Sequence, residues 1–159
     1  MLDDDQEFET LVATAQGAGA TVGAAESLTG GLMGAKLAAV VGAGDVFKGA
    51  IVSYDRTIKH RLLGVPPGPV VSEVAARTMA LNVRQLLECD FSVALTGVAG
   101  PDEQDGQPVG SLFVAVGHPD DRVTTQRLQL SGTPDEIRQE SARQAAIALT
   151  AAMRNGAAT

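Results

Sequence analysis

The sequence predicts an α/β protein: a three-layer α/β/α sandwich around a mixed, mostly parallel sheet of about five strands. Helical and extended apolar patterns alternate along the early part of the chain, which favours parallel strands with helices on both faces. Residues 91–95 form a nearly unbroken apolar run, typical of a strand covered on both faces. A hairpin signal further along requires at least one antiparallel strand.

The first elements are expected to be helix, strand, helix, strand and short helix. Apolar residues at helical spacing define the first helix, which Gly17 and Gly19 end, and they are Phe8, Leu11, Val12 and Ala15. A strand over 21–26 leads to a second helix that opens at 29–31. Its expected core face is Met33, Leu37, Val40 and Val41. A strand over 47–54 and a helix over 56–63 follow.

The remaining elements begin after a stiff proline-rich connection. Ser72 is expected to cap a long helix that has Glu73 in its first turn. Its inner stripe is predicted to be Ala75, Met79, Val83, Leu86 and Leu87. After the strand over 91–95, runs over 109–116 and 122–130 form a hairpin around 117–121. A final helix led by Asp135 and Glu136 buries Ile137, Ala145, Ala148, Leu149 and Ala152, and the tail 155–159 frays.

Composition limits the classes of partner. With 159 residues, we expect one domain over 1–159. The net charge of −7 argues against nucleic acid and anionic membranes as partners. The single cysteine, Cys89, is predicted to be a core residue; it excludes an internal disulfide, and with two histidines it does not supply a four-ligand zinc site. The acidic start MLDDDQEFET and the absence of a long apolar run lead us to expect a cytoplasmic protein.

Three strand ends carry hydroxyl groups or glycines. They are residues 26–31, residues 53–54 with Lys59 about one helical turn beyond, and residues 96–101. Ligands of such sheets sit beyond the carboxyl ends of the strands, so parallel strands would bring these segments to one pocket. The unpaired backbone N–H groups of the second helix at Thr29, Gly30 and Gly31 are then candidates for holding an oxyanion or a phosphate.

Ser27 and Lys59 are the candidate catalytic pair. A serine needs a base, and a buried lysine with a lowered pKa serves as one where histidine is badly placed. His60 in the short helix and His118 in the hairpin turn are badly placed. Structural interpretations remain open: the serine turn as a helix cap, Lys59 and Arg138 as surface charges, Tyr54 as a cover of the sheet edge, and 96–101 as a plain turn.

An ordered set of motifs resembles one known family. The segments are 25–31, the Tyr54 and Lys59 pair followed by 63–65, the helix start at 71–73, the loop 96–101 and the Pro-Val-Gly at 108–110. In this order they resemble the C-terminal domain of CinA, the competence/damage-inducible protein, which also exists alone as nicotinamide-nucleotide amidohydrolase. The resemblance covers roughly residues 5–153. Departures from the family's usual residues fall at Leu28, Asp55, Arg56 and Gln107.

The resemblance implies a reaction and its residues. It implies hydrolysis of the carboxamide of nicotinamide mononucleotide to nicotinate mononucleotide and ammonia, with no cofactor and no metal. It implies Ser27 as nucleophile, Lys59 as base and Tyr54 as support. The substrate-binding residues expected from the turns and the resemblance together are Thr29, Gly30, Gly31, Thr96, Gly97, Gly100 and Arg138.

Two other functions are kept as alternatives. One is a nucleotide-binding regulatory module, linked to competence or DNA damage, that has lost turnover. The other is an amidase for a different small amide. In each case we expect a small-molecule ligand, no nucleic acid or membrane partner, and a homo-oligomer.

Overall fold

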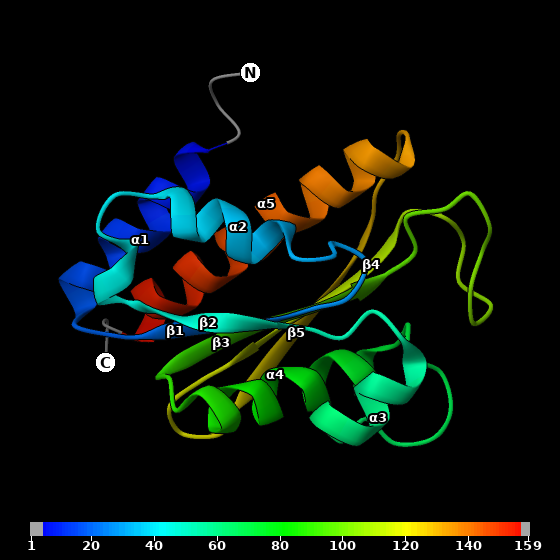
Figure 1. The fold of residues 1–159 in the computed structure, drawn as a ribbon, viewed down its shortest axis with the longest axis horizontal. Coiled ribbons are helices and arrows are strands. Elements are labelled where there is room, and N and C mark those ends of the chain that lie inside the picture. Colours follow the sequence, from blue (N-terminus) through cyan, green and yellow to red (C-terminus); the bar gives the residue numbers. More distant parts are fainter. Residues whose placement is uncertain (1–4, 157–159) are drawn as a thin grey trace.

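A computed structural model describes residues 5–156. Helices and strands alternate from the start, as Figure 1 shows. The elements in chain order are α1 (Gln6–Ala18), β1 (Val22–Glu26), α2 (Leu32–Ala39), the 3-10 helix η1 (Ala43–Asp45), β2 (Phe47–Val52), α3 (Arg56–Leu63), α4 (Glu73–Leu87), β3 (Phe91–Gly97), β4 (Ser111–Gly117), β5 (Val123–Gln129) and α5 (Pro134–Gly156).

One sheet holds the five strands in the order β2-β1-β3-β4-β5. Strand β1 is parallel to both of its neighbours, β2 and β3. Strand β4 is antiparallel to β3 and to β5, so it alone runs against the other strands. The mixed, mostly parallel sheet and the late hairpin are therefore confirmed. The carboxyl ends of β2, β1 and β3 lie at the same edge.

Helices cover both faces of the sheet. Figure 1 shows α1, α2 and α5 on one face and α3 and α4 on the other. Alternate side chains of a strand point to opposite faces, so Val93 and Leu95 pack in the core under α5, whereas Ala94 packs in the core under α4. This arrangement confirms the three-layer α/β/α sandwich.

The core under α4 is built from small side chains, which lets helix and sheet approach closely. Six of its buried residues are alanines on facing surfaces: Ala75, Ala76 and Ala80 of α4, and Ala25, Ala94 and Ala115 of the sheet. At Gly117 a Cβ atom would lie 2.5 Å from Ser92 Oγ and 3.1 Å from the carbonyl oxygen of Ala80. The glycine is therefore required by the close approach of α4 to β4.

Several details of the elements differ from expectation. Val41 is 97% exposed, because α2 ends at Ala39 and the helical spacing no longer applies. Leu86 is 52% exposed, since the inner stripe of α4 passes through Leu87 instead. Helix α1 runs through Gly17 to Ala18, and Gly19 ends it with a φ of 62°. Predictions about 157–159 lie outside the described residues.

Other details are confirmed. The predicted helix over 56–63 coincides with α3. The Ser72 hydroxyl oxygen accepts a hydrogen bond from the backbone N–H of Ala75 at 3.1 Å, so Ser72 caps α4. Cys89 is buried with a free thiol. One expectation is wrong: Asn155 and Gly156, predicted to fray, are the last residues of α5, because the helix continues to Gly156.

Candidate active site

A small cavity lies where β1 and β3 end at the parallel edge of the sheet. Its volume is about 120 Å³. Six of the predicted site residues line it: Ser27, Tyr54, Lys59, Gly97, Gly100 and Arg138. The other lining residues are Leu28, Val70, Val71, Val98, Ala99, Asp102 and Gln104. The structure thus brings segments from β1, α3, β3 and α5 to one place.

Ser27 directly follows β1 and is buried. Its hydroxyl makes no hydrogen bond to another residue within the described chain, so it is free to act on a ligand. Other residues of the cavity wall, among them Leu28, Ala99 and Gly100, have backbone N–H groups that donate to no group of residues 5–156. The cavity therefore combines a free hydroxyl with free N–H donors.

Lys59 is almost fully buried, with 2% of its surface exposed. Its Nζ donates a hydrogen bond to the carbonyl oxygen of Tyr54 at 2.9 Å. Burial lowers the pKa of Lys59 from 10.5 to about 8; Asp55 raises the pKa, Arg56 lowers it and Asp105 raises it, each by a smaller amount. About a tenth of this amine is then uncharged at pH 7, and the uncharged form is the one that a general base requires.

The residues that depart from the family's usual pattern after the tyrosine build the start of α3. The Asp55 carboxylate accepts hydrogen bonds from the backbone N–H groups of Thr57 at 2.8 Å and Ile58 at 3.2 Å. Asp55 is therefore an N-cap, which fixes the first turn of the helix. Lys59 follows within the next turn, so this cap helps to aim the lysine into the cavity.

Val70 and Val71 form one wall of the cavity, and their segment, residues 68–71, is held by Arg56 and Asp105. The Arg56 guanidinium donates to the carbonyl oxygen of Gly68 and to the Asp105 carboxylate, both at 2.7 Å. The same carboxylate accepts from the N–H groups of Val70 at 2.8 Å and Val71 at 3.1 Å. Burial, the largest influence, raises the pKa of Asp105, but the hydrogen bonds from Arg56, Val71 and Val70 together bring the pKa below its usual value.

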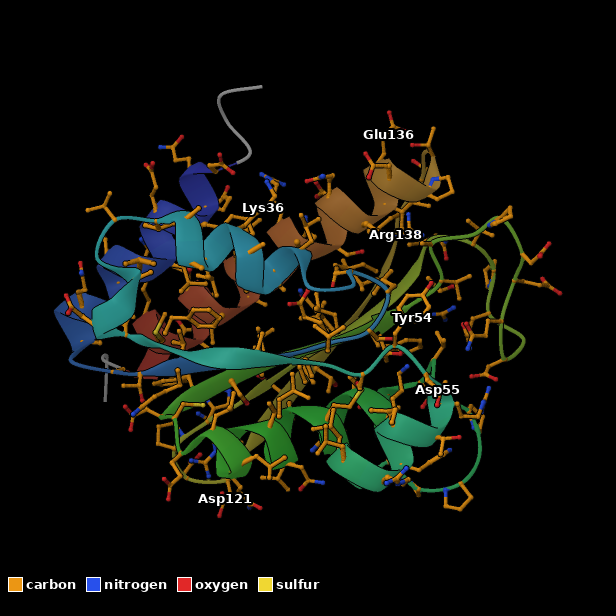
Figure 2. The ribbon with its side chains drawn as sticks, in the orientation of Figure 1. Lys36, Tyr54, Asp55, Asp121, Glu136 and Arg138 are labelled. Carbon is orange, nitrogen blue, oxygen red and sulfur yellow. The ribbon has the colours of Figure 1, made fainter. Side chains whose placement is uncertain are left out.

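Arg138 approaches the cavity from α5. Figure 2 shows Arg138 on the α5 side of the sheet end and Tyr54 closer to the sheet, with Asp55 beyond it on the α3 side. The Arg138 Nε donates to the carbonyl oxygen of Leu28 at 3.2 Å. Its two terminal nitrogens take part in no hydrogen bond or ion pair within residues 5–156, so they can hold an anion. The Tyr54 side chain lies at the rim and is 67% exposed.

Four predicted binding residues do not line the cavity. The hydroxyl of Thr29 and the N–H of Gly31 both donate to the Glu26 carboxylate, at 2.7 and 3.2 Å. The N–H of Gly30 donates to the carbonyl oxygen of Ser27 at 3.1 Å. Thr96 is fully buried, and its hydroxyl donates to the carbonyl oxygen of Val70 at 2.6 Å. These groups support the walls of the cavity, and their hydrogen-bonding capacity is used within the chain.

Sequence reasoning missed four residues of the site. Glu26 and Asp105 hold its walls, and Asp102 and Gln104 line it. A signal existed for Glu26, because a carboxylate at the end of an apolar strand needs donors inside the fold. Loop residues 102–105 gave no signal, since their partners lie far away in the chain. The two histidines lie outside the cavity wall, and His118 contacts Thr124 and Arg122 at the hairpin.

Among residues 5–156, no group of three or more His, Cys, Asp or Glu side chains is arranged to hold a metal ion. No helix in the same range is long and apolar enough to cross a membrane.

The fold and the cavity define a class of small α/β proteins in which a serine and a buried lysine share a site at the carboxyl ends of parallel strands. Within this class, the chain belongs to the CinA C-terminal domain family, whose model matches residues 5–153. The resemblance inferred from the motifs is therefore confirmed.

Relatives in sequence and in structure agree with this membership. The chain is 38% identical over 146 residues to a competence-damage inducible protein of Geobacillus kaustophilus (strain HTA426), covering 89% of this chain and 35% of that protein. For the Oceanobacillus iheyensis protein of the same name the identity is 34% over 142 residues, with 86% and 34% covered. The chain thus spans about a third of the length of these curated relatives.

Two crystal structures of bacterial proteins share the fold. The CinA superfamily protein KP700603 from Klebsiella pneumoniae 700603 matches with a TM-score of 0.91 at 24% identity, covering 96% of this chain and 99% of that one. The competence/damage inducible protein CihA from Agrobacterium tumefaciens matches with a TM-score of 0.89 at 28% identity, covering 95% and 96%. Both comparisons extend over almost the whole of each chain.

Proposed function

We propose that this chain is an amidohydrolase that converts nicotinamide mononucleotide to nicotinate mononucleotide and ammonia. The observation that carries the proposal is the pair formed by Ser27, with its free hydroxyl, and Lys59, a buried amine with a pKa of about 8, in one cavity. A nucleophile beside a base with a lowered pKa is the arrangement that acyl transfer requires. The nucleotide substrate is supported by the resemblance of this chain to the CinA C-terminal domain, which also exists alone as nicotinamide-nucleotide amidohydrolase.

The reaction has two halves. Uncharged Lys59 accepts the Ser27 proton while the Ser27 oxygen attacks the carboxamide carbon. The free N–H groups of Leu28, Ala99 and Gly100 are the donors best available to the oxyanion, in place of those of residues 29–31. Protonated Lys59, with the hydroxyl of Tyr54, returns a proton to the leaving ammonia. Water then attacks the acyl-enzyme, with Lys59 as base again.

The size of the cavity fits the reacting end of this substrate. A volume of about 120 Å³ equals about four water molecules at roughly 30 Å³ each. Pockets that enclose a whole small-molecule ligand measure about 300–1,000 Å³. The cavity therefore takes the carboxamide end of the ring, and the ribose phosphate lies over the rim. Arg138 is the cation at that rim, and it lies in the same cavity wall as Asp102, whose exposed carboxylate repels anions.

The test is ammonia release from nicotinamide mononucleotide by the wild type and by Ser27→Ala. Wild type should release ammonia and Ser27→Ala should not, with an unchanged melting temperature. The matched control is Ser141→Ala, which removes a buried hydroxyl that bonds only to the carbonyl oxygen of Ile137 within α5. This control should keep its activity. Retention of most of the wild-type kcat by Ser27→Ala contradicts the assignment of the nucleophile.

The names of the relatives connect those proteins with competence and damage, and a second candidate function is therefore a nucleotide-binding module without turnover that serves one of these responses. Calorimetric binding of nicotinamide mononucleotide without ammonia release would select it. An amidase for another small amide would release ammonia only in a panel of other amides.

A further inference from the structure

We infer that Glu26 is the positioning residue for Ser27, through a buried carboxylate that fixes the turn between β1 and α2. The inference deepens the proposed function and rests on it for the identity of the nucleophile. Glu26 is the last residue of β1, and none of its surface is exposed. It directly precedes Ser27 in the chain, so its geometry determines where the serine stands.

The Glu26 carboxylate accepts four hydrogen bonds from the turn and from the start of α2. Its Oε1 accepts from the hydroxyl of Thr29 at 2.7 Å and from the N–H groups of Gly31 at 3.2 Å and Met33 at 2.9 Å. Its Oε2 accepts from the N–H of Gly34 at 2.9 Å. An ionised carboxylate has only acceptors, so it matches a set made of four donors.

These hydrogen bonds take the place of a cation. Among residues 5–156, Glu26 forms no ion pair. A buried carboxylate without a cation is unfavourable unless hydrogen bonds compensate for the lost water. The N–H groups at the start of α2 have no partner in their own helix and carry partial positive charge. Glu26 therefore stabilises the start of α2, and α2 stabilises the buried charge.

The main chain around Ser27 is fixed from both sides. The carbonyl oxygen of Glu26 accepts from the N–H of Ser53 at 2.8 Å and from the Ser53 hydroxyl at 3.2 Å. The carbonyl oxygen of Ser27 accepts from the N–H of Gly30 at 3.1 Å. Because Ser53 leads through Tyr54 into α3, this network links the turn of the nucleophile to the element that carries Lys59.

Gly34 leaves the room that the carboxylate occupies. A Cβ atom at this position would lie 3.3 Å from Glu26 Oε2 and 3.0 Å from the Cβ of Ala50. Substitution by alanine would thus press on the carboxylate without removing its charge. Alanine also favours the helix over glycine, so the folded state gains some stability in compensation.

The network also decides where the substrate's phosphate does not bind. Since the N–H groups of Gly31, Met33 and Gly34 donate to Glu26, the start of α2 is not available to an anion. The rim with Arg138 is left as the place for the phosphate. Glu26 should therefore affect the chemical step and leave the affinity for the nucleotide unchanged.

The experiment compares Glu26→Gln and Gly34→Ala with the wild type. The glutamine amide places a donor where the carboxylate accepted, so part of the network loses its acceptor. We expect kcat on nicotinamide mononucleotide to fall about ten- to hundredfold, as a small misplacement of a reacting group does, with KM within about twofold. Gly34→Ala should show the same split between kcat and KM with a smaller loss.

A second readout separates this inference from the proposed substrate. Labelling of Ser27 by a fluorophosphonate reports on the position of the serine and needs no nucleotide. Slower labelling of both variants, with melting temperatures that show folded protein, supports the inference even if no ammonia is released from the nucleotide. Wild-type labelling rates in both folded variants overturn it, and so does a rise in KM with unchanged kcat. If Glu26→Gln does not fold, Gly34→Ala alone decides by the same criteria.

Discussion

Asp55 offers a test of Lys59 as the base that leaves the lysine itself in place. The negative charge of Asp55 raises the pKa of Lys59, against the larger effect of burial. Asparagine caps a helix about as well as aspartate, so Asp55→Asn preserves the hydrogen bonds from Thr57 and Ile58 while it removes the charge. The pKa of Lys59 should therefore fall further below its value of about 8.

The structure sets the size of the effect. With a pKa of about 8, about a tenth of Lys59 is uncharged at pH 7, against about one part in 3,000 at 10.5. An exposed charge pair contributes about 0.2–1 kcal/mol, which equals about 0.15–0.7 pKa unit. Removal of the Asp55 charge should thus raise kcat/KM at pH 7 by about 1.4- to 4-fold. Above the pKa of the base both enzymes should reach the same plateau.

The assay is the pH dependence of kcat/KM for ammonia release between pH 6 and 10, at low salt because screening weakens exposed charges (Debye length about 10 Å at 0.1 M). In the wild type, kcat/KM should rise with pH and reach half of its maximum near pH 8. In Asp55→Asn the half-maximal value should be reached at a lower pH. Asp120→Asn is the control, since this exposed carboxylate at the hairpin is not among the groups that act on Lys59. If a folded Asp55→Asn enzyme reaches half-maximal kcat/KM at the same pH as the wild type, Lys59 is refuted as the titrating base.

Three other changes give distinct outcomes. Lys59→Arg should be nearly inactive at every pH, because arginine stays protonated; turnover by this variant would exclude a lysine base. Arg138→Ala should lose about ten- to a hundredfold in kcat/KM on nicotinamide mononucleotide, from about 1.5–3 kcal/mol for a charged hydrogen bond. Its kcat/KM on nicotinamide riboside, which lacks the phosphate, should fall little. Equal losses on both substrates would mean that Arg138 supports the fold and does not bind the phosphate. Asp105 has a lowered pKa, so its contribution to stability is present above its unfolded value and lost as pH falls through the folded one. The melting temperature of Asp105→Asn should therefore lie below that of wild type at pH 7, with a gap that narrows towards pH 3; a gap independent of pH would contradict this role.

Much of the fold could be predicted from the sequence, because the spacing of apolar residues indicates which side of each helix or strand is buried. The apolar residues of α1 and the unbroken run at 91–95 were buried as expected. The pairing of Ser27 with Lys59 in one cavity followed from strand order, since parallel strands end at one edge.

The rest depended on which polar groups meet, which no pattern of a single chain specifies. The N–H groups near Gly31 looked free in the sequence, but Glu26 reaches them from the preceding strand. Asp105 meets Arg56 across 49 positions of the chain, and a loop without regular structure brings it there. Val41 was misplaced because nothing local predicted that α2 would end at Ala39.

The contact between Arg56 and Asp105 has a consequence for how this chain can diverge. Without the guanidinium, Asp105 keeps a negative charge near the 68–71 wall with no opposite charge beside it. Without the carboxylate, the N–H groups of Val70 and Val71 lose their acceptor. Loss of Arg56 alone therefore leaves an unpaired negative charge, which loss of both side chains would not leave, so a change at position 56 should be accompanied by a change at position 105. Homologues that carry another residue at position 56 should also differ at position 105, and other contacts should then hold the segment that corresponds to residues 68–71.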